Sequence, residues 1–418
     1  MLKETLWGYP SPAKGVEEDC YDESWFISPN KNIAKTKKTA TKLLKFNSKK
    51  SGKENRMFAL KKNPLNVEKF RINSLAMRHT DKVKRISPEK ILDAPGMVDD
   101  FYLNLLDWSS QNVVAIALEH TAYLMDYSTK RISYISPQSS ADKITSLSWM
   151  RLNSNTLAIG LDDGRVEIWD TIENKLLRTL KGHMQRVSSL SWNQNILTTG
   201  SLDTKIINHD IRSANHIVSR FEDHTKEVWG LKWSFDGTQL ASGSNDNTLW
   251  IWDINLARRP RHCFIEHKAA VKALAWCPLE PNLLASGGGT KDKSMKFWNT
   301  DTGEELWSLK TSAQICSLIW SNNSKELVSS HGYEKNELFV WKYSPNTTIE
   351  KWYLTKSAEL CGHESRVLHL ALSPNGTTIA STAPDETLRF WKVFESSEDN
   401  NSYLPFESGN SLFNGTIR

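Results

Sequence analysis

The chain has 418 residues with a formal net charge of +5, and it is 39% hydrophobic with 17 Trp. This composition supplies a large core, but no apolar run is long enough to span a membrane, and the start lacks the apolar stretch of a secretory signal. The five cysteines have no metal-type spacing, so we expect a reduced intracellular protein without a metal or cofactor; they are Cys20, Cys263, Cys277, Cys316 and Cys361.

The first 92 residues differ in charge from the rest. They hold 21 Lys and Arg against 10 Asp and Glu, a balance of +11, whereas the remainder holds 32 against 38, a balance of −6. Fifteen of the 17 Trp lie in that second part. We therefore predict a mostly disordered basic arm over 1–92, followed by a mildly acidic, aromatic-rich globular domain.

Three Ser-Pro steps in this arm carry Lys three residues after the serine, which is the full preference of cyclin-dependent kinases. They begin at Ser11, Ser28 and Ser87, and the Ser-Pro steps of the globular part lack this Lys. Since a phosphate adds about −1.5 to −2 charges, we predict that these serines are regulatory phosphorylation sites. The alternative is that Ser-Pro steps are simply common in disordered arms.

A basic run, KTKKTATKLLK at 35–45, has two interpretations. It suits a nuclear import signal, which predicts a protein of both nucleus and cytoplasm. It would also attract nucleic acid without specificity. The run lacks interleaved aromatic residues, so we expect neither a specific nucleic-acid partner nor a membrane partner.

Residues 93–398 contain a motif that recurs about every forty residues. Its landmark is the last residue of LLDW, SLSW, SLSW, GLKW, ALAW, SLIW and HLAL, at 108, 149, 192, 233, 276, 320 and 372. The spacings are 41, 43, 41, 43, 44 and 52 residues. Alternating strands and Gly, Asp and Asn turns at this period are typical of WD-repeat blades. We predict an all-β fold, a seven-bladed WD-repeat β-propeller, with a longer outer connection in the last step and a flexible tail over 399–418.

Four repeats carry a His that is followed 20–25 residues later by an Asp. With nearby Ser and Thr these pairs imitate a hydrolase triad. A catalytic apparatus would occur once, so we predict hydrogen-bond staples within blades and no enzymatic activity. The pairs are His183 with Asp203, His224 with Asp246, His267 with Asp292, and His363 with Asp385.

Longer strings resemble one family of propellers. KILDAPGMVDDFYLNLLDWSSQNVVAIAL (90–118), EVWGLKWS (227–234) and GHESRVLHLALSP (362–374) closely resemble the fizzy/fizzy-related family, the substrate-recruiting co-activators of the anaphase-promoting complex. The similarity covers roughly residues 85–418, and FWNT and RFWKVF look more like the fizzy-related branch. The resemblance implies a non-catalytic adaptor of a ubiquitin ligase.

The resemblance also implies two degron sites for substrates such as cyclins. For the destruction box, Asp100 and Glu386 would hold an arginine between the first and last blades. Asp107 suits the lysine of a KEN degron and Arg366 its glutamate. The alternatives are solvated surface acids and ordinary turn residues. The full set that the resemblance implies for the KEN degron is Asp107, Asn245, Asn247, Thr290, Gln314 and Arg366.

In the arm, the resemblance implies a short box, Asp-Arg-Phe/Tyr-Ile-Pro, that contacts and stimulates the ligase. The best match is DESWFISP (22–29), in which Trp25, Phe26 and Ile27 keep the aromatic-aromatic-aliphatic character. Trp25 replaces the arginine, and Ser28 separates Ile27 from the proline, so the box is degenerate. A co-activator and a family-like inhibitor or decoy therefore both stay open, and a specialised paralogue, for example a meiotic one, fits the short arm.

Two further short motifs take a meaning from the family. Lys53-Glu54-Asn55 is itself a KEN tripeptide, either a degron or a self-blocking pseudosubstrate. The last two residues, Ile417 and Arg418, match the dipeptide by which family members dock on a helical-repeat subunit of the ligase. An apolar side chain, a guanidinium and a free carboxylate give such a terminus three recognisable groups.

Overall fold

The computed structural model describes residues 4–5, 83–138, 142–254, 259–333, 336–346 and 351–395. Within these ranges the regular structure consists of strands β1–β30, and the described part contains no helix that could cross a membrane. Ser87 lies in these ranges, exposed between β2 and β3. The other features predicted in the arm and tail lie outside them: Ser11, Trp25–Ser28, the basic run 35–45, Lys53–Asn55 and Ile417–Arg418.

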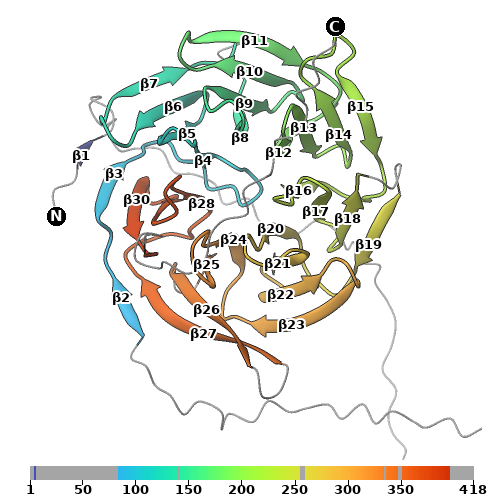
Figure 1. The fold of residues 1–418 in the computed structure, drawn as a ribbon. Helices are drawn as coiled ribbons and strands as arrows, with labels where there is room; N and C mark the ends of the chain where they lie inside the picture. Colours follow the sequence, from blue (N-terminus) through green and yellow to red (C-terminus); the bar gives the residue numbers. More distant parts are fainter. Residues whose placement is uncertain are drawn as a thin grey trace, which may run out of the picture. The chain divides into compact units, whose positions relative to one another are not determined.

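Seven sheets follow one another around a central axis in chain order, as Figure 1 shows. The predicted seven-bladed all-β propeller is confirmed. Each blade is an antiparallel sheet whose first strand lies innermost. The first three blades are β4–β7 (Leu106–Trp108, Val113–Leu118, Thr121–Asp126, Ile132–Ile135), β8–β11 (Ile144–Trp149, Thr156–Leu161, Val166–Asp170, Lys175–Leu180) and β12–β15 (Val187–Asn193, Ile196–Ser201, Ile206–Asp210, Ile217–Phe221).

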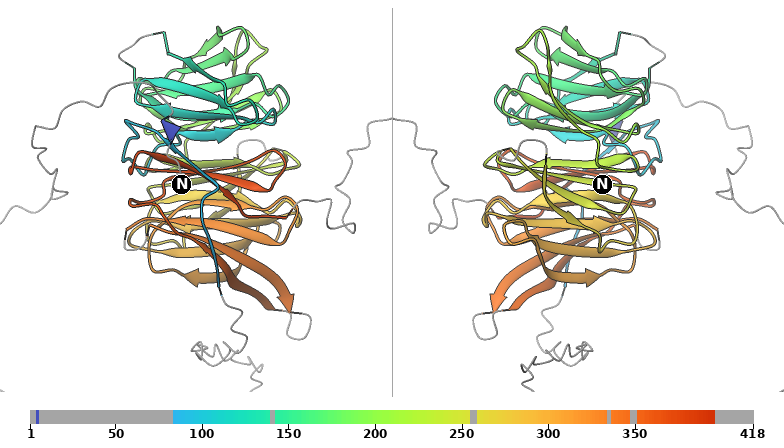
Figure 2. Two further views of the ribbon diagram at one scale, coloured as in Figure 1. Left: turned by 90° about the vertical axis from the view of Figure 1, so that its left-hand side faces the viewer. Right: turned by 90° about the vertical axis from the view of Figure 1, so that its right-hand side faces the viewer.

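The fourth and fifth blades have the same order. They are β16–β19 (Val228–Trp233, Gln239–Ser244, Leu249–Asp253, Pro260–Phe264) and β20–β23 (Val271–Trp276, Leu283–Gly288, Ser294–Asn299, Glu304–Lys310). The sixth contains β24 (Ile315–Trp320), β25 (Glu326–His331), β26 (Leu338–Asn346) and β27 (Lys351–Leu360). The long β26–β27 hairpin projects from the body in Figure 2 and accounts for the 52-residue step.

The last blade is completed by residues from the N-terminal side of the ring. Its own strands are β28 (His369–Leu372), β29 (Thr378–Ala383) and β30 (Thr387–Lys392), and β3 (Lys90–Asp93) pairs antiparallel with β30. β1 (Glu4–Thr5) pairs parallel with β3, and β2 (Lys84–Ile86) pairs parallel with β27. The sheets therefore include residues before the expected boundary at 92, because the ring closes through non-local strand pairing.

The landmark residues end the innermost strands or stand one residue before the end, as the repeat predicts. Two residues earlier, every one of the seven repeats has a buried leucine that lines the central channel. These seven form a ring, the leucine ring: Leu106, Leu147, Leu190, Leu231, Leu274, Leu318 and Leu370. Their apolar side chains are buried where neighbouring blades pack together around the channel.

The four His–Asp pairs are hydrogen-bonded within their blades, so the staple interpretation is confirmed. In the fourth blade His224 Nδ1 lies 3.0 Å from an Asp246 oxygen, and His224 Nε2 lies 2.8 Å from Ser242 Oγ. Trp252 Nε1 donates to the same hydroxyl at 2.9 Å. The fifth and last blades repeat this chain, and the third blade has His209 in the place of the Trp. These histidines are bound by structural partners in repeated positions.

Candidate functional site

In Figure 1 the segment between β3 and β4 runs toward the centre of the ring, and we call its residues 99–104 the plug. Two ion pairs hold it. Arg366, just before β28, donates from Nε to the Asp99 carboxylate and from Nη2 to the Asp99 carbonyl at 3.0 Å. Arg186, just before β12, donates to Asp100 at 3.1 Å. The plug therefore bridges the second-to-third and sixth-to-seventh blade connections.

Aromatic residues anchor the middle of the plug. Tyr102 stacks on Trp229 of β16, with ring centroids 4.3 Å apart, and the Arg186 guanidinium lies 5.2 Å from the Trp229 ring. Phe101 lies edge-on to Tyr102, and Lys272 Nζ of β20 is 5.3 Å from the Phe101 ring centre. Stacked rings and cation–π contacts of this kind each stabilise a buried arrangement by about 0.5–2 kcal/mol.

Asn104 ties the end of the plug to three blades. Its Nδ2 donates to the carbonyls of Ser188, at 2.7 Å, and Trp229, at 3.2 Å, and its backbone NH donates to the Thr145 carbonyl at 3.1 Å. These backbone acceptors would otherwise face the channel. The plug thus contacts every blade other than its own, because Phe101 also packs on Cys316 and Leu368.

Most of the residues that the resemblance assigns to the KEN degron lie on the face that carries the plug. Thr290 donates to the Gln314 carboxamide at 2.6 Å, so the structure brings these two together. Asn245 donates to Glu227 at 3.0 Å, and Asn247 holds a left-handed turn with φ of 68°. Arg366 lies at the plug. Gln314 and Arg366 stand just before innermost strands, and the other three residues stand in the turns that follow the second strands of their blades.

Asp107 does not join that group. It lies in β4, one residue before the landmark Trp108, and its carboxylate accepts the backbone NH of Trp108 at 2.9 Å and of Trp149 at 2.8 Å. Burial raises the pKa of Asp107, against the opposing influence of Lys232. In this structure Asp107 bonds the first blade to the second and faces the channel below the leucine ring.

Asp100 and Glu386, assigned to the destruction box, have separate partners in the structure. Glu386 lies in the β29–β30 turn, where its carboxylate accepts the Gly96 NH at 3.2 Å and its carbonyl accepts the Ala94 NH. Asp100 accepts from Arg186 and from the backbone NH of Tyr102. The segment 94–100 connects them, so both carboxylates help to place the entry into the plug.

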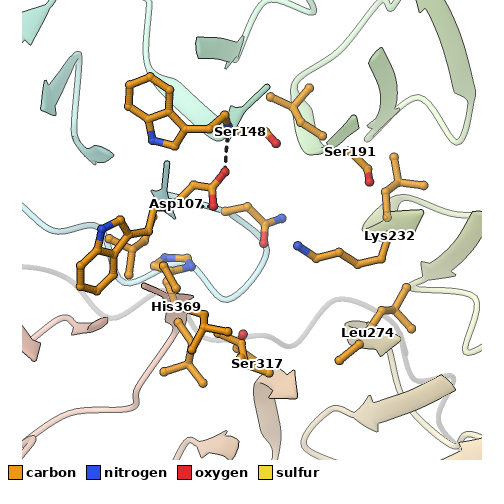
Figure 3. A pocket seen from close by; sticks show the side chains of 18 of the residues that line it. Asp107, Ser148, Ser191, Lys232, Leu274, Ser317 and His369 are labelled. Carbon is orange, nitrogen blue, oxygen red and sulfur yellow. Dashed lines mark hydrogen bonds between the residues drawn. The ribbon is translucent and has the colours of Figure 1, made fainter. Parts of the chain in front are cut away.

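A cavity of about 490 Å³ occupies the channel. Figure 3 shows side chains from several innermost strands pointing into it, among them Asp107, Lys232 and His369. Of its charged lining residues, Arg151, Lys232 and Lys272 are cationic and Asp107 is anionic. Burial lowers the pKa of Lys272 to about 8, although Cys316 and Asp100 act to raise it. The cavity has an excess of positive charge.

Sequence reasoning missed Arg186, Tyr102, Trp229 and Lys272. A signal was present for two of them, because Trp229 and Lys272 stand four residues before their landmarks, at the level where innermost strands begin. A second Trp and a Lys at a buried strand position are unusual. Arg186 and Tyr102 carried no such signal, since only the folded ring places them beside Trp229.

One group of side chains in the described residues has the spacing of a metal site. Glu337, Glu359 and Cys361 have ligand atoms within 4.8 Å of one another. Glu359 already pairs with Lys356 and lies 3.9 Å from Arg85. Burial raises the pKa of the Cys361 thiol, with the two glutamates adding to the effect, so the thiolate form that binds metal is disfavoured.

Comparison with known proteins identifies the family. The CDC20/Fizzy WD40 domain matches residues 92–391. The chain belongs to the CDC20/Fizzy WD40 family. It is 53% identical over 311 residues to the Anaphase-promoting complex subunit cdc20 of Dictyostelium discoideum, over 74% of this chain and 60% of that protein. It is 52% identical over 313 residues to Cell division cycle 20.1, cofactor of APC complex, of Arabidopsis thaliana, over 73% and 66%.

Both branches of the family are among the relatives. Protein FIZZY-RELATED 2 of Arabidopsis thaliana is 46% identical over 335 residues, 80% of this chain and 67% of that protein, a lower identity than that of the two cdc20 proteins. A solved structure, "Crystal Structure of Mitotic Checkpoint Complex", matches with a TM-score of 0.70 and 44% identity, over 74% of this chain and 96% of that one. The match with the first of these relatives spans about 60% of its length.

Proposed function

We propose that this protein is a co-activator of the anaphase-promoting complex, a non-catalytic adaptor that brings substrates to the ligase. The observation that carries the proposal is the family membership, since relatives more than 50% identical are named as a subunit or a cofactor of that complex. The propeller supplies a rigid face for peptides, and the ligase itself would transfer ubiquitin.

The plug face supports a role in degron binding. It gathers a guanidinium, Arg366, with the hydroxyl and carboxamide of Thr290 and Gln314, which suit a peptide that carries a carboxylate and an amide. We propose that the KEN degron binds there, with Asn245 and Asn247 on the adjoining turn. Asp107, which would address the lysine of the degron, stays part of the proposed site and also bonds the first blade to the second.

For the destruction box we propose the strip from Glu386 to Asp100. A degron arginine would compete with Arg186 for the Asp100 carboxylate and with the Gly96 NH for Glu386. Bidentate carboxylate–guanidinium bonds are strong enough for such an exchange. A charge-reversed D100K/E386K chain should lose destruction-box peptide binding while KEN peptide binding is retained; equal loss of both peptides would contradict separate sites.

Contacts with the ligase are proposed for the two end segments, Trp25–Ile27 and Ile417–Arg418. We propose further that a cyclin-dependent kinase acts on Ser11, Ser28 and Ser87, and that phosphate at Ser28 opposes ligase binding because it adds negative charge inside the box. The basic run 35–45 would bring the protein into the nucleus, with a cytoplasmic fraction. Lys53–Asn55 would make it a substrate or a pseudosubstrate of the same ligase.

The test is ubiquitination of a substrate with both degrons by purified anaphase-promoting complex. Three reactions are compared: no addition, the full chain, and the chain without Ile417-Arg418. Stimulation that falls with the deletion is the expected result. No stimulation, together with competition against an active co-activator, would favour the second candidate, a decoy of the same ligase, which the substitutions in SWFISP make a specific alternative.

A further inference from the structure

Four residues that line the central cavity have a buried side-chain nitrogen with no hydrogen-bond partner among the described residues, and three of the four lie on the side of the plug. These three are Trp229 Nε1, Lys272 Nζ and His369 Nε2. The exposed fractions of these side chains are 2%, 6% and 4%. An unpaired polar group this deeply buried costs about 1–3 kcal/mol, so three around one cavity require an explanation.

The repeat places the three groups at one level of the channel. Trp229 and Lys272 each stand four residues before their landmarks, and His369 stands three before its own. All three therefore lie on the plug side of the leucine ring. Trp229 and Lys272 are linked through Tyr102 and Phe101 of the plug, whose rings they contact. Trp149 Nε1, a fourth unpartnered group of the cavity lining, lies at the opposite end of its strand.

The chemistry of these groups is that of donors. A Trp indole and a Lys ammonium donate and never accept, and His369 Nε2 joins them as a donor in the tautomer that carries the imidazole proton on this atom. Of the charged lining residues, Lys272 lies with these groups on the plug side, whereas Lys232, Arg151 and Asp107 lie beyond the leucine ring. Two fixed donors, one of them a cation, and His369 in the Nε2-protonated tautomer complement an acceptor that carries negative charge.

We propose that the upper channel is a binding site for a small inorganic anion, held by Lys272 Nζ, Trp229 Nε1 and His369 Nε2 beneath the plug. The channel as a whole, at about 490 Å³, is larger than an ion of phosphate size with its first waters. Charged groups on the surrounding elements are Asp100 in the plug and Arg366 before β28, and Cys316 of β24 adds a thiol. Asp100 opposes an anion and Arg366 attracts it.

A bound anion would also affect the plug. Lys272 interacts electrostatically with Asp100 and Arg366, the two residues through which the plug is tied to its neighbours. Neutralising the ammonium relieves its repulsion of Arg366. We expect the anion to order the plug and to raise the stability of the ring, whether or not degrons bind above it.

The experiment uses the full chain in low-salt HEPES buffer at pH 7. Phosphate, sulfate and chloride are titrated separately, with calorimetry for binding and thermal unfolding for stability. We expect one anion to raise the Tm by about 2–4 °C with saturation in the millimolar range, as a site would. Non-specific salt effects rise steadily to much higher concentrations.

Matched variants identify the site. Lys272→Met should abolish the saturable rise, and Lys268→Met, an exposed lysine just before the same strand, should keep it. Trp229→Phe keeps an aromatic ring for Tyr102 to stack on and removes the indole N–H. This variant should therefore weaken anion binding several-fold. It tests the site independently if Lys272→Met does not fold. The same Tm rise in all variants, or a rise without saturation, would mean an adventitious ion only and overturn the proposal.

Discussion

Arg366 and Asp99 join the last blade to the plug by two hydrogen bonds, from Nε to the carboxylate and from Nη2 to the backbone carbonyl. The Arg366 side chain is 13% exposed and that of Asp99 is 55% exposed. The guanidinium also lies 5.0 Å from the Tyr333 ring centre. A carboxylate of an incoming peptide can therefore reach a fixed cation whose partner is itself accessible to solvent.

Arg366→Ala should weaken binding of a KEN peptide at least tenfold, since hydrogen bonds to a charged group contribute about 1.5–3 kcal/mol. The measurement is fluorescence anisotropy with a labelled peptide. Lys392→Ala, which removes an exposed cation at the end of β30, is the control and should leave affinity unchanged. Equal affinity of the Arg366 variant and the wild-type chain would exclude Arg366 from the site.

Asp107→Ala should lower the stability of the whole ring. The substitution leaves the Trp108 and Trp149 NH groups without their acceptor, at a cost of about 1–3 kcal/mol each if no water replaces it. Urea unfolding measures the loss. If Asp107→Ala unfolds like the wild-type chain but loses KEN peptide binding, Asp107 contacts the degron directly, as the family resemblance implied.

The lowered pKa of Lys272 predicts that the free energy of unfolding rises at alkaline pH. Its pKa is lowered to about 8 in the folded protein, chiefly by burial, against about 10.4 in an unfolded chain. Between these values the unfolded state binds more protons, so the free energy of unfolding should rise with pH. Compared with Lys272→Met, the wild-type chain should gain on the order of 3 kcal/mol from pH 8 to 10.5. Parallel curves for the two chains would contradict this.

The lowered pKa of Asp203 predicts that the free energy of unfolding falls in acid. Burial acts to raise its pKa, but the hydrogen bond and charge of His183 outweigh it and lower the pKa to about 2. The stabilisation is complete above the unfolded pKa near 3.9 and is lost as the pH falls toward 2. Asp203→Asn should therefore flatten the stability curve between pH 4 and 2 by about 1–2 kcal/mol. The exposed Asp223→Asn variant should follow the wild-type curve.

Truncation tests the closure of the ring. A chain that begins at residue 94 lacks β3, whose Leu92 is 3% exposed and which covers the edge of β30. It should lose several kcal/mol of stability and aggregate through the open strand edge. A chain that begins at residue 83 keeps β2 and β3 and should unfold at nearly the temperature of the full chain. Equal Tm values for both truncations would show that the β3–β30 pairing is dispensable.

The sequence by itself determined the repeat and what the repeat implies. The landmark at 41–52-residue spacing defined seven blades, and the recurrence of the His–Asp pairs identified them as staples, because local periodicity records which residues each blade needs. The strings from 85 to the last blade also identified the family that the comparisons show. These features depend on residues close together in the chain.

The tertiary structure alone decided what the ring brings together from distant positions. β3 completes a blade almost 300 residues away in sequence, and the plug meets Arg186, Trp229, Lys272 and Arg366 from four different blades. Only the folded ring, likewise, places Asp107 beside the Trp149 NH and brings Thr290 to Gln314. A strand has two ends and its residues face in alternate directions, so only the closed ring fixes which side chains share a face.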